Sequence, residues 1–448
     1  MTSEVVVMNC AAVALAADSA ATVSSGGGNK IFNSADKLFM LSKHHPVGVM
    51  VYSKSSLLGV PWETILKLFR RQLGTTAFPR LQDYSKALLT FLAEGRTLFP
   101  REVQDRCYQK LVEATFKRIV ESIEDRIYQD LIEKDVDSTD RQKLARTIIL
   151  EELSTWQTMS DATCYDPVLG EAMANRFSGQ ISKLMLQIFA EFPPDAEASI
   201  ALRKLAMLLV SKEAIPREAR SGLVIAGFGR DDHFPVMQHF HLGEIYQDCL
   251  KYRHVKDFSV AVAKPAYVEP FAHAEMIETF LTGINPLFQR RVLDEIRSLL
   301  ANLPVDVVDE IDDLTDEQKN KWRAKVGPIG EEVAASLFKE LGDYRVRQHL
   351  APIYRAIAHL PKDQLAQVAA SLVNLNSFQK RMSLKPETVG GPIDVAVISK
   401  GDGFIWIDRK HYFKPELNHH FFRNYYSTYS QSGDDYDADT APKKDSDR

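Results

Sequence analysis

Two histidines stand at a spacing that could bring both imidazoles to one metal ion. His239 and His241 are two residues apart, so on a strand they would share one face. The other histidines considered as partners lie elsewhere in the chain, at His233 and in the pair His419-His420. A metal site also needs further ligands at a known spacing, and no carboxylate stands at one. The sequence therefore predicts no bound metal.

A glycine-rich stretch is the second feature that could do chemistry. Residues 25–30, SGGGNK, lack the GxxxxGK[ST] spacing of a phosphate-binding loop, and Ile31 occupies the position of its metal-binding hydroxyl. We interpret the stretch as a turn between strands and expect no cofactor.

Cysteine spacing suggests no third kind of site. The four cysteines are far apart and form no CxxC pair: Cys10, Cys107, Cys164 and Cys249. This pattern predicts neither a zinc site nor a disulfide framework, and it favours a reducing, cytoplasmic setting.

The composition is that of an ordinary globular protein and narrows the classes of partner. Of 448 residues, 45% are apolar and 26% charged, and the net charge is −5. The chain therefore lacks the positive field that supports non-specific binding to nucleic acid, so no nucleic-acid partner is expected. It also contains no run of about 18 apolar residues, so no membrane-spanning helix and no membrane partner are expected.

Apolar runs and helical periodicity alternate along the chain. Short apolar runs predict strands in three blocks, at residues 5–7, 12–16, 38–41 and 47–51, then 223–226, 235–237 and 258–262, then 393–398 and 404–407. Segments with a helical period fill most of residues 61–213 and 272–380. Strand blocks too short to fold singly must pair into shared sheets covered by helices, which predicts an α+β fold.

The first strand block resembles a known family. The run Ala12–Thr22, AVALAADSAAT, resembles the second-strand motif of the β-type subunits of the proteasome and of their bacterial relatives, which are N-terminal nucleophile (Ntn) hydrolases. Counting back from Asp18 without a gap places the family's nucleophilic threonine on Thr2, the first residue once Met1 is removed. Residues 37–51 resemble the next hairpin, which begins with the family's catalytic lysine. Lys37 is the match, and Lys30 is the weaker alternative.

The resemblance covers roughly half of the chain, mostly the strand blocks, and extends to residues 221–229 and 389–397. It implies a four-layer αββα sandwich with large helical insertions. The implied division begins with a first part of the Ntn domain (1–74), a helical insertion (75–200) and a second part of the domain (201–284). A second helical insertion (285–355), the last helix with the closing strands (356–426) and a disordered acidic tail (427–448) follow.

The resemblance also implies the chemistry of a threonine-dependent amide hydrolase. A threonine hydroxyl is a weak nucleophile, and a free α-amino group with a reference pKa near 7.7–8.0 is a base on the same residue. In the family the lysine favours the unprotonated amine and the aspartate keeps the lysine charged, which are roles for Lys37 and Asp18. The family's glycine whose backbone N–H binds the oxyanion falls on Ser53. The added side chain is expected to narrow the substrate cleft and to favour a different backbone conformation.

Two auxiliary positions depart from the family pattern. The serine and aspartate that support the terminal amine would fall near residues 387–389, where Thr388 is the nearest match. The other supporting serine would fall near residues 271–274, where His273 stands beside a predicted helix start.

The sequence thus leaves two hypotheses open. The first is a threonine-dependent amide or peptide hydrolase with Thr2 as nucleophile, a peptide or protein as substrate, and a homo-oligomer such as a ring as its assembly. The second is a catalytically inactive Ntn-fold scaffold or partner-binding protein, which the auxiliary departures favour. The sequence does not identify an ATP-dependent unfoldase that would work with either.

Overall fold

The computed structural model describes residues 2–25, 28–133, 138–162, 167–216, 219–311, 314–382, 390–420, 422 and 423. The chain divides into two compact units, Met1–Asp408 and Arg409–Arg448. The described part of the second unit includes a short 3-10 helix, Pro415–Leu417. All strands and long helices named below belong to the first unit.

One five-stranded antiparallel sheet contains the start of the chain. Its strand order is β12-β1-β2-β13-β14, and the strands span Ala266–Ala272, Ser3–Asn9, Ala12–Asp18, Ile393–Ser399 and Gly403–Asp408. Every residue of β1 and β2 is buried, which explains why their sequences are apolar without alternation. The prediction of two strands in the first twenty residues is confirmed, as is the final hairpin of β13 and β14.

A second five-stranded antiparallel sheet has the order β11-β10-β9-β6-β5. These strands span Cys249–Ser259, Val236–Tyr246, Ser221–Gly227, Val47–Tyr52 and Leu38–Met40. β10 and β11 are much longer than predicted. In β11 exposed residues such as Arg253, Lys256 and Asp257 interrupt the apolar run, and in β10 the buried polar residues Gln238 and Glu244 do so. Two small hairpins join β3 (Ala21–Ser25) to β4 (Gly28–Phe32) and β7 (Ser56–Leu57) to β8 (Val60–Pro61), so the turn predicted at residues 25–30 is shorter than expected.

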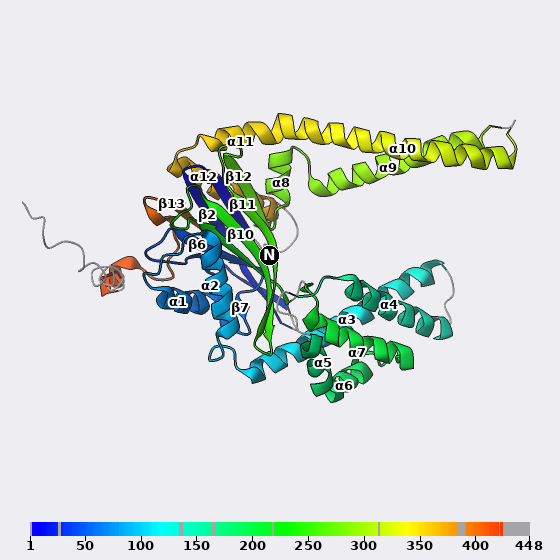
Figure 1. The fold of residues 1–448 in the computed structure, drawn as a ribbon, viewed down its shortest axis with the longest axis horizontal. Coiled ribbons are helices and arrows are strands. Elements are labelled where there is room, and N and C mark those ends of the chain that lie inside the picture. The colour runs from blue at the N-terminus through cyan, green and yellow to red at the C-terminus, as the bar shows by residue number, and fades with distance from the viewer. Residues whose placement is uncertain are drawn as a thin grey trace, which may run out of the picture. The chain divides into compact units, whose positions relative to one another are not determined.

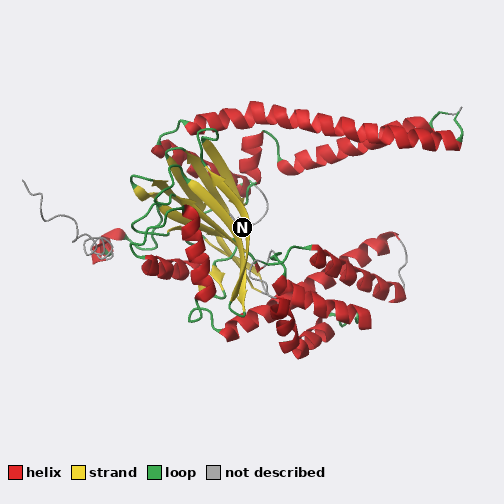
Figure 2. Ribbon diagram, in the orientation of Figure 1, coloured by secondary structure: helices red, strands yellow, loops and turns green. Residues whose placement is uncertain are grey.

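The two sheets pack on each other, and each is covered by helices on its other face (Figures 1 and 2). Between the sheets lies an apolar core that includes Val6 and Leu15 from the first sheet and Met50 and Val224 from the second. Val5, one residue before Val6, lies instead in the core beneath the helices of the first sheet, as the two-residue period of a strand requires.

Different helices cover the two sheets. α8 (Glu275–Thr282), α11 (Ala351–Ala358) and α12 (Lys362–Arg381) cover the first sheet, and α1 (Trp62–Leu73) and α2 (Leu81–Glu94) cover the second. α2 shares its core with the strands, although it falls within the range that the sequence assigned to an insertion.

Five further helices share a separate apolar core. They are α3 (Arg101–Glu133), α4 (Ser138–Thr158), α5 (Pro167–Arg176), α6 (Ser178–Ile188) and α7 (Ala196–Ser211). Phe116 and Phe189 meet edge to face in this core, with ring centroids 5.7 Å apart. Tyr246, the last residue of β10, also packs in it and connects these helices to the second sheet.

The second helical segment is a hairpin of two long helices. α9 (Pro286–Asp309) and α10 (Asp316–Arg345) run side by side in opposite directions, and a short π-helix (Val346–Leu350) leads from α10 into α11 (Figure 1). Their closest approach is at Gly330, where a Cβ atom would lie only 1.9 Å from the carbonyl oxygen of Leu300. Glycine is required there by the approach of the two backbones.

The structure also bears on the disulfide bonds and the membrane-spanning helices considered from the sequence. Cys249 is disulfide-bonded, so the prediction of no disulfide is wrong there, whereas Cys10 and Cys107 are free. The cysteine pattern, which contains no CxxC pair, did not predict this bond. Among the residues that the structure describes, no helix is both long enough and apolar enough to cross a membrane.

Candidate active site

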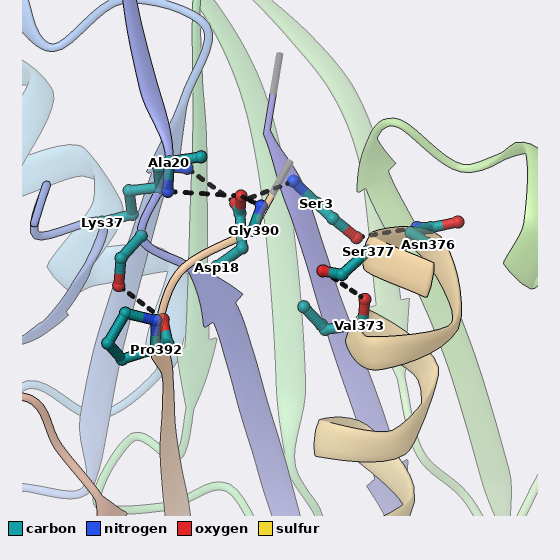
Figure 3. Close-up of polar contacts among 10 residues, drawn as sticks. Ser3, Asp18, Ala20, Lys37, Val373, Asn376, Ser377, Gly390 and Pro392 are labelled. Atoms are coloured by element: carbon teal, nitrogen blue, oxygen red, sulfur yellow. Dashed lines mark hydrogen bonds and ion pairs between the residues drawn. The ribbon is translucent and has the colours of Figure 1, made fainter. Parts of the chain in front are cut away.

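The candidate site is centred on the carboxylate of Asp18, the last residue of β2. Because β1 and β2 are antiparallel, the end of β2 lies beside the start of β1, and Ser3 donates its backbone N–H to Asp18 Oδ1 at 2.9 Å. The other oxygen, Oδ2, accepts from the N–H groups of Ala20 at 3.3 Å and Gly390 at 3.0 Å (Figure 3). Asp18 is buried, and these donors hold its charge and orientation.

Lys37 completes this arrangement with a buried ion pair. It stands immediately before β5, and its Nζ lies 2.6 Å from Asp18 Oδ1 (Figure 3). Its carbonyl accepts from the N–H of Val51, which ties the residue to the neighbouring strand. A buried lysine needs such a counter-charge to stay ionised. The structure therefore brings together Asp18 and Lys37, two of the residues selected from the sequence.

Thr2 precedes β1 and is only 8% exposed. Its carbonyl accepts from the N–H of His273 at 2.9 Å. The side chain of Asn376 in α12 donates to the carbonyl of His273 at 2.6 Å. It also donates to Ser3 Oγ at 2.7 Å (Figure 3). The start of β1 is thus fixed on one side by α12 and on the other by Asp18.

His273 lies near the start of the chain, and its backbone N–H and carbonyl make the contacts with Thr2 and Asn376. It stands two residues before α8 and is half-buried. Burial lowers the pKa of its imidazole, and the positive charge of Lys380 lowers it further. The neutral ring is therefore the favoured form near neutral pH.

Ser53 follows β6, is exposed, and has a left-handed backbone with φ +72°. A residue other than glycine pays a steric cost in this conformation. Ser53 therefore occupies a strained backbone position.

Replacing Ser53 with Gly should stabilise the protein. The left-handed conformation costs a non-glycine residue roughly 1 kcal/mol, and the larger entropy of glycine in the unfolded chain offsets part of the gain. We expect Ser53→Gly to raise the free energy of unfolding by roughly 0.5 kcal/mol, measured by urea denaturation. A decrease would contradict the left-handed conformation at this position.

The remaining sequence candidates lie differently. Lys30, the weaker match for the lysine, is exposed on β4, and its Nζ lies 5.1 Å from the centroid of the Phe32 ring. The partner of Asp18 is Lys37. Thr388 lies outside the described residues.

Glu4 is a buried acid that the sequence analysis did not select. It lies on the same face of β1 as Val6, which points into the core between the sheets. Neither of its carboxylate oxygens has a hydrogen-bond partner among the residues that the structure describes. Burial raises its pKa to about 8, an effect that Lys37 partly offsets and Asp18 reinforces. Glu4 is therefore mostly a neutral acid at pH 7, which leaves Asp18 as the counter-charge of Lys37.

Tyr52 and two histidines form a neighbouring polar cluster. The hydroxyl of Tyr52 lies 2.7 Å from Nε2 of His239 and 3.3 Å from Nε2 of His241. Burial lowers the pKa of His239 to about 3 and that of His241 to about 4, so both are neutral near pH 7. The tyrosine ring lies against Gly222, where a Cβ atom would come within 2.0 Å of it.

The two histidines therefore do share a strand face, and they use it to contact Tyr52. Among the residues that the structure describes, no group of three or more histidine, cysteine or acidic side chains could hold a metal ion.

The sequence analysis missed Ser3, Glu4, Asn376 and Gly390. A polar residue in an otherwise apolar run was the available signal for Glu4, and an asparagine on the buried face of a helix was the signal for Asn376. Gly390 lies within residues 389–397, to which the resemblance extends. Its backbone N–H could not be assigned to Asp18, 372 residues away, without the fold.

The arrangement places a buried ion pair beside the start of β1. A buried ammonium is held by a carboxylate, and the same carboxylate oxygen binds the N–H of the residue that follows Thr2. A positive charge in this position favours the unprotonated form of a nearby amine.

No known protein family and no curated protein matches the sequence. Similar solved structures include Anbu (ancestral beta-subunit) from Yersinia bercovieri, with 11% identity, 96% of this chain and 97% of that chain covered, and a TM-score of 0.27. The helical assembly of the Anbu complex from Pseudomonas aeruginosa has 7% identity, 96% of each chain covered and a TM-score of 0.31. Anbu from Hyphomicrobium sp. strain MC1 has 8% identity, 98% and 100% covered, and a TM-score of 0.25. TM-scores of this size do not establish a common fold, so the site is interpreted from its own residues.

Proposed function

We propose that the chain is a threonine-dependent amide or peptide hydrolase of the Ntn type, with Thr2 as nucleophile after removal of Met1. The observation that carries the proposal is the buried pair of Lys37 and Asp18, whose Nζ and Oδ1 are 2.6 Å apart, with the N–H of Ser3 on the same oxygen. The proposal includes a four-layer αββα sandwich as the fold, a cytoplasmic location and a homo-oligomer such as a ring as the assembly.

The helical segments at residues 75–200 and 285–355 are proposed insertions into this sandwich. Because α2 shares a core with the second sheet, we propose that the first insertion proper begins after it, at α3. The helices α3 to α7 have their own apolar core, as an inserted subdomain requires.

The chemistry follows from the residue types. The α-amine of Thr2 would accept the hydroxyl proton while Oγ1 attacks the carbonyl carbon of an amide. The leaving amine would take up the proton, and water would then hydrolyse the threonyl ester. Lys37 would favour the unprotonated amine, Asp18 would hold Lys37, and the N–H of Ser53 would help bind the oxyanion. Lys30, Thr388 and His273 remain auxiliary candidates in this scheme.

The test begins with the mass of the purified protein, which shows whether Met1 is retained. We expect a processed terminus, covalent labelling of Thr2 by a threonine-directed inhibitor, and no labelling of a Thr2→Ala variant. Thr76→Ala is the matched control, because it removes the hydroxyl of an exposed threonine outside the candidate site and should leave labelling intact. A retained Met1 would block the amine, and it would favour the alternative of an inactive Ntn-fold scaffold.

A further inference from the structure

The hairpin of α9 and α10 has more apolar side chains than the contact between its two helices uses. The residues that face the other helix are the least exposed ones, including Val308 on α9 and Ala334 on α10, together with the close approach at Gly330. We call these least exposed residues the seam of the hairpin. A second set of large apolar side chains lies outside the seam.

This second set has a regular position. The members of this set recur with the helical period, and most of them stand one residue before a residue of the seam. Their exposed fractions lie between 49% and 65%. The set comprises Phe288, Leu299, Leu303 and Val307 on α9, and Trp322, Ile329, Val333 and Tyr344 on α10. We call it the hairpin face.

Both halves of the hairpin face lie on the same side of the pair. In two antiparallel helices, positions that precede the seam on one helix flank it on the same side as positions that precede it on the other. Positions that follow the seam lie on the opposite side, and they include Arg297, Glu331 and Ala335. The hairpin is therefore amphipathic as a unit, with one apolar and one polar side.

The size of the hairpin face matches that of a protein interface. Eight large side chains, each about half exposed, present roughly 800 Å² of surface, which is the area that each partner buries in a standard interface. An apolar surface of this extent is uncommon on a monomer.

Charges at the edge of the hairpin face favour a second copy of this chain as the partner. At the distal end, Asp306 and Glu310 border the face on the α9 side, whereas Lys321 and Lys325 border it on the α10 side. A twofold axis parallel to the helices of the hairpin would place α9 of one copy against α10 of the other. The acidic residues on the α9 side would then meet the lysines on the α10 side of the second copy. Nearer the first turn of α9, Arg291 would likewise meet Asp343 of the second copy.

We infer that the hairpin face binds the hairpin face of a second copy, forming an antiparallel four-helix bundle that joins two chains. The self-complementary apolar surface and the charge pattern fit an isologous twofold contact. This inference does not depend on the hydrolase proposal, since it uses no residue of the candidate active site.

The first test measures the mass of the full chain by sedimentation equilibrium across micromolar concentrations. We expect a reversible dimer, or a larger assembly built from it, and a Leu303→Glu/Ile329→Glu variant should raise the dissociation constant by roughly 100-fold or more, as loss of two central contacts does. Ala335→Glu is the matched control, because it adds a charge to the polar side of the same hairpin and should leave association unchanged. A monomeric wild type, or an assembly whose mass the double variant does not alter, would overturn the inference.

The second test uses charge reversal, so that it does not depend on one variant's folding. Asp306→Lys/Glu310→Lys and Lys321→Glu/Lys325→Glu should each weaken self-association, because like charges would then meet between copies. An equimolar mixture of the two variants should associate more tightly than either alone, since opposite charges are restored across the contact. A mixture that associates no better than its components would refute the proposed pairing of α9 with α10 of the second copy.

Discussion

Lys37→Met is expected to destabilise the protein by about 3–5 kcal/mol and to abolish covalent labelling of Thr2. Removing the ammonium leaves the buried carboxylate of Asp18 without its counter-charge, although three backbone N–H groups still bind it. The loss of stability is measured by urea denaturation at pH 7, and the loss of labelling by intact mass after incubation with the inhibitor.

A double-mutant cycle separates the pair from its surroundings. Asp18→Asn should also destabilise the protein, because it leaves Lys37 buried without an anion and turns an amide toward backbone donors. The double variant Lys37→Met/Asp18→Asn should cost less than the two single changes added together, since no unpaired charge remains. Additive costs would show that the two side chains stabilise the fold independently of each other.

An exposed pair gives the matched control for this prediction. Lys67 and Glu63 form an ion pair one turn apart on α1, with both side chains about half exposed. Lys67→Met should change the free energy of unfolding by roughly 0.5 kcal/mol or less, because water screens the pair. If Lys37→Met cost no more than Lys67→Met, the buried pair would not be the structural centre of the site.

The sequence predicts strands most clearly where both faces of a strand are buried. β1, β2, β6 and β9 lie between two cores, so their runs are continuously apolar and stand out from their surroundings. β11 carries several exposed charged side chains, and its pairing with β10 is interrupted by register shifts. Its length could not be inferred from apolar periodicity alone.

The site was predictable only as far as local motifs extend. Asp18 and Lys37 were selected through a resemblance carried by short runs around them, and the structure joins them. The groups that complete the surroundings come from distant segments, such as Asn376 in α12, which is 373 residues from Ser3. A single sequence does not specify such contacts, because they follow from how the sheets and helices pack.

The helical segments show a similar limit. Helical period predicted that these segments are helices, but the same period occurs in helices that cover a sheet and in helices that form a separate core. α2 belongs to the first kind and α3 to α7 to the second, and only their packing partners distinguish them.

Glu4→Gln is expected to stabilise the protein in a pH-dependent way. In the folded state burial raises the pKa of Glu4 to about 8, compared with 4.5 in an exposed chain. Between these values the folded state holds a proton that the unfolded state has released, so the wild type loses stability as the pH rises from 4.5 to 8. Glutamine removes this titration without adding a charge.

The expected difference is large at high pH and small at low pH. At about 1.4 kcal/mol per pKa unit the full effect approaches 5 kcal/mol, and we expect Glu4→Gln to be roughly 2–5 kcal/mol more stable than the wild type at pH 8. Near pH 4.5 the two proteins should differ little, because Glu4 is then protonated in the folded state and half protonated in the unfolded state. Urea denaturation at several pH values between these limits measures the slope.

Glu244 is the matched control, because it is also buried but has partners. Its carboxylate accepts from Lys54 Nζ at 2.6 Å and from the N–H of Leu58 at 2.8 Å, so Glu244→Gln should destabilise the protein at pH 8. The same chemical change should therefore have opposite signs at the two positions, because one carboxylate is paired and the other is not. Equal destabilisation by both substitutions would show that Glu4 has a charged partner in the folded protein, and that it acts as an anion beside Lys37.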